Sequence, residues 1–526
     1  MPRTLRDLIL ALSLANLCFM GAWRVLVNPL HYTYYHWKYY PGFTEYAALL
    51  IDVLALAALF WGAATLARRS GNRYVMKAAR WAFLLALVVP LNDLRMQLAG
   101  SHFTDILGSR KSLLVALAAL LVVAGTALVR WRARVVSAAV TVVLILSPFA
   151  LMALFQGAWL AIKHRPNAAL AVDRAAGPLP QPGRLPGARV VWIVFDELDQ
   201  RMAFTARPPG LELPELDRLR REAVFAEKAV PPSSDTLFSM PSLISGQQIA
   251  WALAVRPNEL LVTARGSTEE VAWSTQPNVF AEARAAGADT AVVGWYHPYC
   301  RVLADSLSSC FWEPVVDDIS PLRGEPTLLK GMAHWATVSL FRIPGAFRLL
   351  AHWYESGRRQ DHIEEYLKIM GRARAAVRER GFGLTLLHFP IPHHPFIYDR
   401  ARGALSARTE NSYADNLVLT DRALGELRRE MEAAGLWEET AVIVSSDHWW
   451  RSLPDALVDK RVPFIVKLRG QQEGAVYENA FNTVLTRSLI LAVLRGEVGD
   501  PPGLMRWLDQ NRSDAEPVTG SNQPTH

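Results

Sequence analysis

Long apolar stretches are confined to the first third of the chain. Five of them are long enough for a helix to cross a hydrocarbon core of about 30 Å, which takes roughly 20 residues. Beyond them, short apolar runs alternate with amphipathic stretches and are separated by Pro and Gly. We therefore predict a bundle of five transmembrane helices followed by a globular module. The predicted spans are residues 6–28, 46–67, 79–98, 112–129 and 135–161.

The globular module begins with an unbroken apolar run at residues 189–195. Such a run is typical of a strand that is covered on both faces of a sheet. Further strands and helices alternate along the chain, which favours an α/β domain with a mostly parallel sheet between helices. The other predicted strands are residues 290–293, 384–388, 441–445 and 464–468. The predicted helices are residues 215–223, 281–286, 362–379 and 416–434.

These patterns predict four parts of the chain. A transmembrane domain covers residues 1–162, and a linker rich in Ala, Pro, Gly and Arg covers residues 163–188. The α/β domain covers residues 189–510. A polar tail at residues 511–526 is expected to be disordered.

Basic residues are unevenly shared among the connections between the spans. They precede the first span and fill the second and fourth connections, whereas the first connection carries only Lys38 among many Tyr, Trp and His residues. Arg110 and Lys111 in the third connection are a mild exception. Because basic connections stay in the cytoplasm, we expect a multi-pass protein of the cell (inner) membrane whose N-terminus lies inside. Five spans then place the α/β domain on the extracytoplasmic, periplasmic side.

Cysteine usage and charge add two constraints. Cys300 and Cys310 are the only cysteines of the predicted outer domain, and a pair ten residues apart in an oxidising compartment is expected to form a disulfide. Two free thiols are the alternative. The formal net charge is +7, but many of the basic residues are the cytoplasmic anchors, and no segment resembles a nucleic-acid-binding module. We expect no nucleic acid among the partners.

Metal-binding side chains stand at three separate places in the globular module. Asp196 follows the first predicted strand, Thr236 lies in a loop rich in Pro and Ser, and Asp447 and His448 follow a late strand. Three oxygens and a nitrogen suit zinc, with calcium, magnesium or manganese as alternatives. A hydroxyl beside a divalent metal ion indicates transfer through a covalent enzyme intermediate, because the metal lowers the pKa of the hydroxyl.

The order of these motifs resembles that of the alkaline phosphatase and sulfatase superfamily over about residues 189–468. The spans followed by an outer domain are similar to the phosphoethanolamine transferases and the lipoteichoic acid synthases, which use a threonine nucleophile. The landmarks that carry the resemblance are Asp196-Glu197, the Thr236 loop, His393-His394-Pro395-Phe396, Tyr413-Ala414-Asp415-Asn416 and Ser446-Asp447-His448.

The resemblance implies roles for individual residues. Thr236 would attack, and it would hold the metal together with Asp196, Asp447 and His448. His393 would contact the transferred group or a second ion, and His297 is a candidate substrate contact. The competing nucleophiles are Ser239 and the nearby Ser233 and Ser234, whereas a sulfatase-type formylglycine is not expected because no cysteine lies in this loop.

One segment departs from the family pattern. The family has Gly and then a further His after Asp-His, whereas this chain continues Trp449-Trp450-Arg451 and reaches residue 463 without a histidine. Lys460 or Arg461 is a candidate to neutralise the phosphate instead, since a fixed cation can replace part of the charge of a metal. An inactive protein that keeps the fold is the other reading.

We therefore expect an enzyme that transfers a phosphoethanolamine or phosphoglycerol type of group. The donor would be a membrane lipid, the acceptor an envelope glycan or lipid, and the intermediate a covalent adduct of Thr236. Hydrolysis of a phosphate or sulfate ester is a closely related alternative. A catalytically silent scaffold in envelope-polymer assembly is an alternative of a different class.

Overall fold

The chain divides into two compact units in a computed structural model. Unit 1 is Met1–His31, Tyr39–Ala168 and Asp317–Ala351, and unit 2 is Tyr32–Lys38, Ala169–Val316 and His352–His526. The structure describes all residues except 1, 29–31, 39–40, 100–129, 164–176, 180–186, 188, 316–326, 342, 344–345, 409, 452–458, 513–515 and 519–526.

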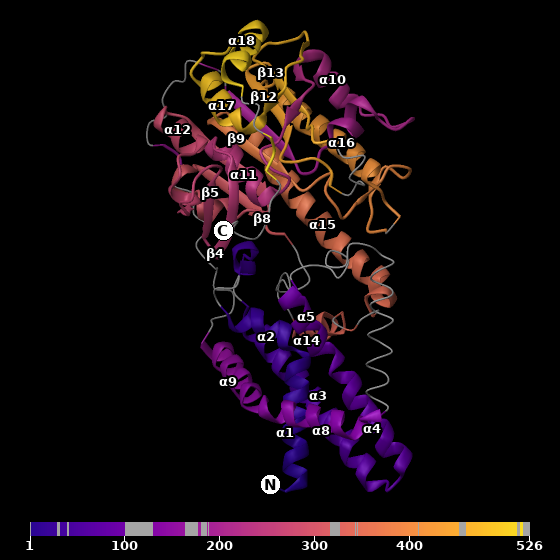
Figure 1. Cartoon of the computed structure of the whole chain (residues 1–526). Helices are drawn as coiled ribbons and strands as arrows, with labels where there is room; N and C mark the ends of the chain where they lie inside the picture. The colour runs from indigo at the N-terminus through magenta and orange to yellow at the C-terminus, as the bar shows by residue number, and fades with distance from the viewer. Residues whose placement is uncertain are drawn as a thin grey trace. The chain divides into compact units, whose positions relative to one another are not determined.

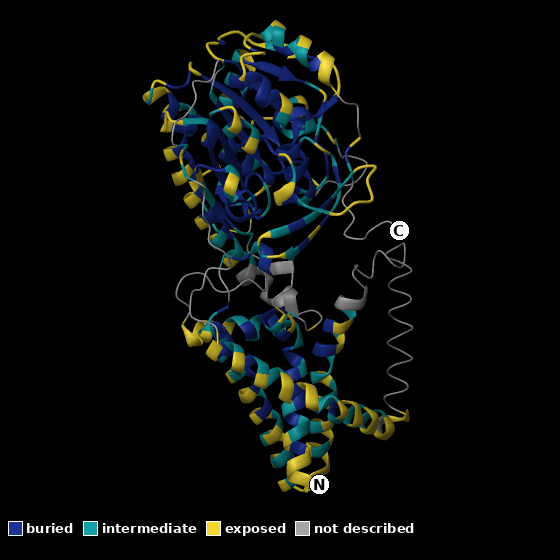
Figure 2. Cartoon of the chain, turned by 90° about the vertical axis from the view of Figure 1, so that its left-hand side faces the viewer, coloured by how far each residue is buried: buried dark blue, intermediate teal, exposed yellow. Residues whose placement is uncertain are grey.

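Unit 1 is built from apolar helices (Figure 1). Many of their large apolar side chains are exposed, for example Phe155 at 74% and Ile162 at 81%, as a hydrocarbon environment requires. The same exposure is visible along these helices in Figure 2. The helices are α1 (Arg3–Cys18), α2 (Met20–Val27), α3 (Phe43–Arg69), α4 (Arg73–Ala86), α5 (Val88–Ala99), α8 (Arg132–Ile145), α9 (Ser147–Lys163) and α14 (Leu328–Leu340).

The described helices include three that are long and apolar enough to cross a membrane, namely Phe43–Arg69, Arg73–Arg95 and Ala133–Lys163. Helices α1 and α2 form a pair bent by 70° and make a fourth crossing if the pair is one span. The described part of the chain thus supports three or four of the five predicted spans. The remaining one, at residues 112–129, lies outside the described residues.

Unit 2 is built around a mixed, mainly parallel sheet of eight strands. Strand β1 pairs in parallel with β12 on one side and β9 on the other, while β13 is antiparallel to both of its neighbours. The spatial order is β14 (Ala475–Tyr477), β2 (Val224–Ala226), β13 (Phe464–Lys467), β12 (Thr440–Ser446), β1 (Arg189–Phe195), β9 (Phe382–Phe389), β7 (Asp289–Trp295) and β8 (Ser309–Glu313). The predicted α/β class is confirmed.

Each face of the sheet carries its own apolar core, and this explains the unbroken apolar run of β1. Val190, Trp192 and Val194 belong to one core, whereas Val191 and Ile193 belong to the other. The strands accordingly lie at the buried centre of the unit in Figure 2. Helices α11 (Thr236–Ser245), α12 (Val279–Ala285), α17 (Thr486–Leu494) and α18 (Pro501–Asn511) cover the first face. Helices α10 (Pro214–Glu222), α15 (Ala346–Arg378) and α16 (Tyr413–Ala433) cover the second.

The remaining strands form small accessory sheets. The largest is an antiparallel sheet of β4 (Ile249–Arg256), β5 (Glu259–Ala264) and β6 (Val271–Ala272). Two further pairs join β3 (Ala229–Val230) with β15 (Phe481–Asn482) and β10 (Tyr398–Asp399) with β11 (Ala404–Leu405).

Two segments cross the predicted boundary between the modules. Tyr32–Lys38 comes from the first predicted connection between spans but folds with unit 2. Asp317–Ala351 comes from the predicted α/β domain but folds with unit 1. Each unit is therefore assembled from several stretches of the chain.

Candidate active site and metal centre

The register of β1 and β12 brings the candidate metal ligands to one edge of the sheet. Phe195 pairs with Ser446, so Asp196 and Asp447 leave two adjacent parallel strands at the same level. This is the carboxyl edge of the strands, where open α/β sheets place their sites. The Ser446 hydroxyl donates to the Phe195 carbonyl at 2.7 Å and accepts from the Leu198 backbone at 2.9 Å, which joins the two strand ends.

Thr236 is presented by the first turn of α11. Asp235 caps this helix, because its carboxylate accepts a hydrogen bond of 3.0 Å from the Leu237 backbone. Aspartate is among the preferred capping residues, since it satisfies a backbone N–H that has no partner within the helix. The helix ends at Gly246, which adopts a left-handed φ of 71°. The cap fixes where the first helical residue, Thr236, begins.

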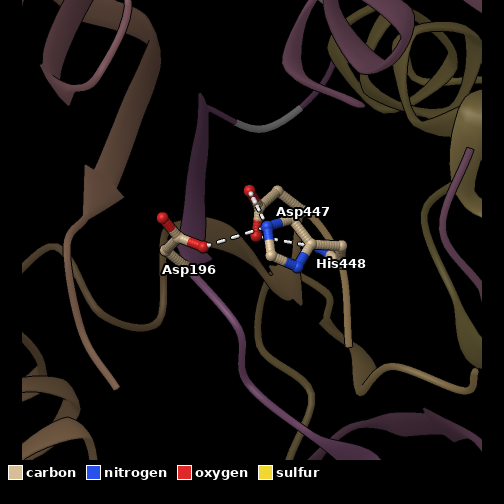
Figure 3. Close-up of side chains that lie close together, drawn as sticks. All are labelled: Asp196, Asp447 and His448. Carbon is tan, nitrogen blue, oxygen red and sulfur yellow. Dashed lines mark hydrogen bonds and ion pairs between the residues drawn. The ribbon is translucent and has the colours of Figure 1, made fainter. Parts of the chain in front are cut away.

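The four predicted ligands lie together. Thr236 Oγ1 is 2.7 Å from Asp447 Oδ2 and 3.2 Å from His448 Nε2. His448 Nε2 is also 3.3 Å from Asp196 Oδ1, and the ligand atoms of Asp196, Asp447 and His448 all lie within 4.8 Å of one another (Figure 3). The three side chains are fully buried, and Thr236 is 3% exposed.

The hydrogen bonds of His448 determine what its other nitrogen offers to the site. Nδ1 lies 2.9 Å from the carbonyl oxygen of Trp449. A carbonyl only accepts, so Nδ1 carries a proton, and a neutral ring then offers the lone pair of Nε2. That lone pair faces the carboxylates of Asp196 and Asp447 at 3.3 and 3.5 Å. Nitrogen and oxygen atoms that converge in this way fit a bound cation.

The charge state of the two carboxylates supports the same conclusion. Burial and the neighbouring charge of Asp447 raise the pKa of Asp196 well above its ordinary value. Both oxygens of Asp196 are buried and accept no hydrogen bond. Burial also acts on Asp447, but His448, His388 and the Thr236 hydroxyl hold its pKa below the ordinary value. A divalent cation would relieve both the repulsion and the missing partners, so the residues present fit a metal ion.

Arg451 is the site residue whose role the sequence did not reveal. Its Nε lies 3.2 Å from the Glu197 carboxylate and its Nη1 lies 3.0 Å from the Asp235 carboxylate. Both carboxylates belong to neighbours of the site, since Glu197 follows Asp196 and Asp235 precedes Thr236. The side chain of Arg451 is 39% exposed. The only signal in the sequence was the departure Trp449-Trp450-Arg451 from the family pattern.

Two family landmarks on α16 form the frame of the site. The Tyr413 hydroxyl donates to the Glu197 carbonyl at 2.7 Å, and the Tyr413 ring stacks on Trp450 at 4.0 Å between centroids. Asn416 donates to the His393 carbonyl at 3.3 Å. Glu197 has a left-handed φ of 63°, which is uncommon for a residue with a side chain and is held here by these contacts.

The other predicted site residues are placed as follows. His393 is buried, its backbone donates to the Asp196 carbonyl at 3.1 Å, and its Nδ1 has no hydrogen-bond partner. Burial lowers the pKa of His393 to about 4, so the ring is neutral at pH 7. His297 is fully buried and bonds the backbone of Thr236 rather than facing the ligand cluster with a free nitrogen.

Lys460 and Ser239 make other contacts. The Lys460 ammonium lies 4.0 Å from the Glu516 carboxylate and is 48% exposed, and no described contact joins it to the four candidate ligands. The competing nucleophile Ser239 donates its hydroxyl to the Ser233 carbonyl at 3.1 Å. Of the two hydroxyls, the one of Thr236 touches the ligand cluster.

A segment from the predicted tail lies against the loop that precedes the candidate nucleophile Thr236. Val518 pairs with Ser233, accepts a 3.0 Å bond from the Ser234 backbone and donates a 2.9 Å bond to the Pro232 carbonyl. Upstream, the Gln248 side chain donates to the Glu516 carbonyl at 2.8 Å. Residues 516–518 are thus ordered against the loop, although the sequence predicted disorder from residue 511 onward.

The predicted disulfide is present. Cys300 and Cys310 are bonded and link α13 (Tyr299–Val302) to strand β8. The free cysteine among the described residues, Cys18, is buried in α1.

Sequence comparison identifies a family for the globular module. Residues 190–480 match the family model described as type I phosphodiesterase / nucleotide pyrophosphatase. This match agrees with the resemblance to the alkaline phosphatase and sulfatase superfamily. No curated protein sequence matches the chain.

Solved structures that match this chain in a structure comparison include a sulfatase, a synthase and a hydrolase. The sulfatase PsFucS1 from Pseudoalteromonas sp. is 15% identical, with 64% of this chain and 71% of that chain covered and a TM-score of 0.40. The lipoteichoic acid synthase LtaP from Listeria monocytogenes is 13% identical, with 65% and 76% covered and a TM-score of 0.37. The phosphonate monoester hydrolase of Agrobacterium radiobacter is 13% identical, with 60% and 78% covered and a TM-score of 0.34.

Proposed function

Because this chain belongs to the type I phosphodiesterase and nucleotide pyrophosphatase family, we propose that it transfers a phospho-substituent from a membrane lipid to an envelope acceptor. The transferred group is of the phosphoethanolamine or phosphoglycerol type, and it passes through a covalent adduct of Thr236. The observation that carries this proposal is the position of the Thr236 hydroxyl, 2.7 Å from Asp447 and 3.2 Å from His448 at a buried cation site.

In the first step Thr236 Oγ1 forms a bond to the phosphorus of the lipid headgroup. The bond from phosphorus to the lipid alcohol breaks, and that alcohol leaves with the proton that Thr236 gives up. The threonine hydroxyl donates its hydrogen bond to Asp447 Oδ2, so this carboxylate is placed to take the proton during attack and to release it to the leaving alcohol. Asp196, Thr236, Asp447 and His448 would hold a divalent metal ion, which would lower the pKa of the hydroxyl and stabilise charge on the phosphate.

In the second step an acceptor hydroxyl attacks the phosphorus of the threonine adduct. The bond to Thr236 Oγ1 breaks, the threonine regains a proton, and the acceptor keeps the group. If water takes the place of the acceptor, the same residues perform hydrolysis. Apolar helices that suit a membrane favour a lipid donor, because they keep the enzyme at the surface where that donor is found.

Arg451 supplies the fixed positive charge in this proposal. Its guanidinium is held between the carboxylates of Glu197 and Asp235. In the chain, Glu197 follows Asp196 and Asp235 precedes Thr236. Preorganised cations aimed at developing charge are among the largest contributions to phosphoryl transfer. His393, with a buried and unpartnered Nδ1, is assigned to contact the transferred group.

The catalytic unit is proposed to face the extracytoplasmic side. The uneven distribution of Arg and Lys among the connections supports this orientation. The disulfide between Cys300 and Cys310 supports it as well, since disulfides persist in oxidising compartments.

Mass spectrometry of the adduct tests the proposal. The full-length protein in lipid nanodiscs that contain phosphatidylethanolamine and phosphatidylglycerol is incubated with zinc, and the peptide that contains Thr236 is analysed. We expect a mass increase that corresponds to one of the two headgroup phosphates. Thr236→Ala should lose the adduct, and Ser239→Ala should keep it.

The outcomes separate the alternatives. An adduct on Ser239 would overturn the assignment of the nucleophile. Release of free headgroup phosphate in the presence of acceptor, without transfer to it, would identify a hydrolase. Absence of both adduct and turnover in metal-loaded protein would support a silent scaffold.

A further inference from the structure

The first connection between the apolar helices supplies a short helix to the catalytic unit. This helix, η1 (Tyr32–His36), lies in the chain between α2 and α3. Tyr34 and Trp37 are 2% exposed and Tyr35 is fully buried. Tyr35 belongs to the same core as Trp192 of the central strand β1. A connection that only joined two membrane helices would not need to bury three aromatic side chains in another unit.

Polar contacts fix this segment at its buried tyrosine and just after it. Arg301, the neighbour of Cys300, donates to the backbone carbonyls of Tyr35 at 3.3 Å and Trp37 at 2.7 Å. Lys38 forms an ion pair of 2.9 Å with Glu313 at the end of β8. Both anchors flank the disulfide, so the segment rests on a covalently closed part of the fold.

A chain of two hydrogen bonds leads from Tyr35 to the nucleophile. The Tyr35 hydroxyl lies 2.9 Å from His297 Nδ1, and His297 Nε2 lies 3.0 Å from the carbonyl oxygen of Thr236. The carbonyl can only accept, so Nε2 carries the proton and Nδ1 accepts from the tyrosine. Tyr35 therefore selects the tautomer in which His297 can donate to Thr236.

The backbone next to His297 is held in an uncommon conformation. Tyr296 has a left-handed φ of 72°, and its carbonyl lies 3.4 Å from Nδ1 of His36. Such conformations persist only where the surroundings hold them, and they concentrate at functional sites. The segment thus contacts the turn before His297 as well as the ring.

We propose that Tyr35 and His297 are positioning residues for the Thr236 nucleophile, so that a connection between two membrane helices completes the active site. This inference rests on the proposed function, because it takes Thr236 as the attacking group. The bond from His297 fixes the backbone of the residue whose hydroxyl contacts Asp447 and His448. Attack requires this hydroxyl to be placed to within a fraction of an ångström.

Single-turnover kinetics of the Thr236 adduct test the inference with the full-length protein in nanodiscs. Tyr35→Phe keeps the ring and removes the hydroxyl, so His297 can adopt the other tautomer, whose lone pair would face the Thr236 carbonyl. We expect the rate of adduct formation to fall about tenfold, the scale of one lost hydrogen bond that leaves a buried group unsatisfied. The KM for the lipid donor should stay within about twofold, since the lost contact is to the enzyme and not to the donor.

A double-mutant cycle separates positioning from a general structural effect. His297→Gln keeps an N–H donor toward Thr236 but needs no hydroxyl to select a tautomer. In that background Tyr35→Phe should have less than about a twofold effect, since coupling is lost when one partner is replaced. An equal loss in both backgrounds would overturn the inference.

Tyr477→Phe is the matched control. It also removes a hydroxyl from a tyrosine of the same core, but that hydroxyl bonds Asp509 at 2.8 Å instead of a histidine of the site. We expect this variant to retain the wild-type rate.

A spectroscopic measurement gives a readout that does not depend on turnover. Nitrogen-15 shifts of histidine should show His297 protonated at Nε2 in the wild type and a mixture of tautomers in Tyr35→Phe. An unchanged tautomer with an unchanged rate would overturn the inference.

Thr236→Ala distinguishes this failure from that of the proposed function: if Thr236→Ala still turns over, the proposed function fails. If Thr236→Ala is inactive and Tyr35→Phe equals the wild type, only the positioning role fails.

Discussion

Arg451 Nε lies 3.2 Å from the carboxylate of Glu197, the residue that follows the candidate ligand Asp196. The same guanidinium contacts Asp235, which precedes the nucleophile. One cation thus joins the two loops that carry the site. This arginine, in the segment that departs from the family pattern, is held in place by two acids.

Arg451→Gln is expected to slow formation of the Thr236 adduct by about 10- to 100-fold, because a positive charge near the developing phosphate charge is lost. Lys460→Gln should have little effect, since Lys460 is half-exposed and pairs with Glu516. Single-turnover rates of the two variants provide the measurement. If Lys460→Gln slows adduct formation more than Arg451→Gln does, then Lys460, one of the two cations predicted from the sequence, neutralises the phosphate.

Asp196→Asn should have opposite effects on stability with and without metal. Without metal the substitution replaces a carboxyl whose charged form is disfavoured by burial and by the charge of Asp447, so the variant should unfold at a higher temperature than the wild type. With zinc at about a hundredfold excess over its Kd, the wild type should gain about 2.7 kcal/mol, and the variant should gain much less. Thermal unfolding with chelator and with added zinc checks both signs, and an equal gain in the two proteins would argue against Asp196 as a ligand.

The pH dependence of stability should show that the pKa of the buried Asp421 carboxyl is raised. Its carboxylate accepts a 2.8 Å bond from the Leu216 backbone, and burial raises its pKa to about 6 from an ordinary 3.8. A raised pKa in the folded state means that stability is greatest below the unfolded pKa and is lost as pH rises through the folded pKa. Between pH 5 and 7.5 the wild type should therefore lose about 1 kcal/mol more than Asp421→Asn. Denaturant unfolding of both proteins at the two pH values measures this difference. An equal loss of stability in the wild type and in Asp421→Asn would contradict the raised pKa of Asp421.

Removal of the disulfide should destabilise the catalytic unit. Cys300 and Cys310 enclose a short loop, and the entropy model for a loop of this length gives about 2 to 3 kcal/mol. Cys300→Ser with Cys310→Ser should lower the free energy of unfolding by that amount. Cys18→Ser serves as the control, because Cys18 is a free cysteine.

The same cysteines report the orientation of the unit in cells. Thiol alkylation of denatured protein without prior reduction, followed by mass detection, should find Cys18 alkylated and Cys300 and Cys310 unmodified. Complete alkylation of all three cysteines in rapidly quenched cells would place the unit in a reducing compartment and contradict the proposed orientation.

The central strands could be predicted because each is an unbroken apolar run. The predicted strands at residues 189–195 and 441–445 correspond to β1 and β12 within one residue at either end. Strand β2, with three residues, is too short to show a pattern, and β4 alternates exposed and buried positions only in part. Helix α15 begins 16 residues before its predicted start at residue 362, because its first half mixes apolar and charged residues without clear helical periodicity.

The cluster of candidate ligands could be predicted because strand ends and motifs bring these residues to one edge of the sheet. Asp196, Thr236, Asp447 and His448 lie together as expected. Arg451 and Tyr35 could not be predicted, since their roles depend on the direction of a side chain and on the docking of a distant segment. His297 was identified from its place after a strand, but its two hydrogen bonds are visible only in three dimensions.

The pairing of Val518 with Ser233 has a practical consequence for recombinant work. An affinity tag or fluorescent reporter fused close behind residue 518 would disturb the pairing of Val518 with the loop that precedes the candidate nucleophile Thr236. A protein engineered in this way could show low activity for reasons unrelated to its chemistry. Purification handles are better placed at the other terminus, and any reporter beyond residue 518 needs a long flexible spacer.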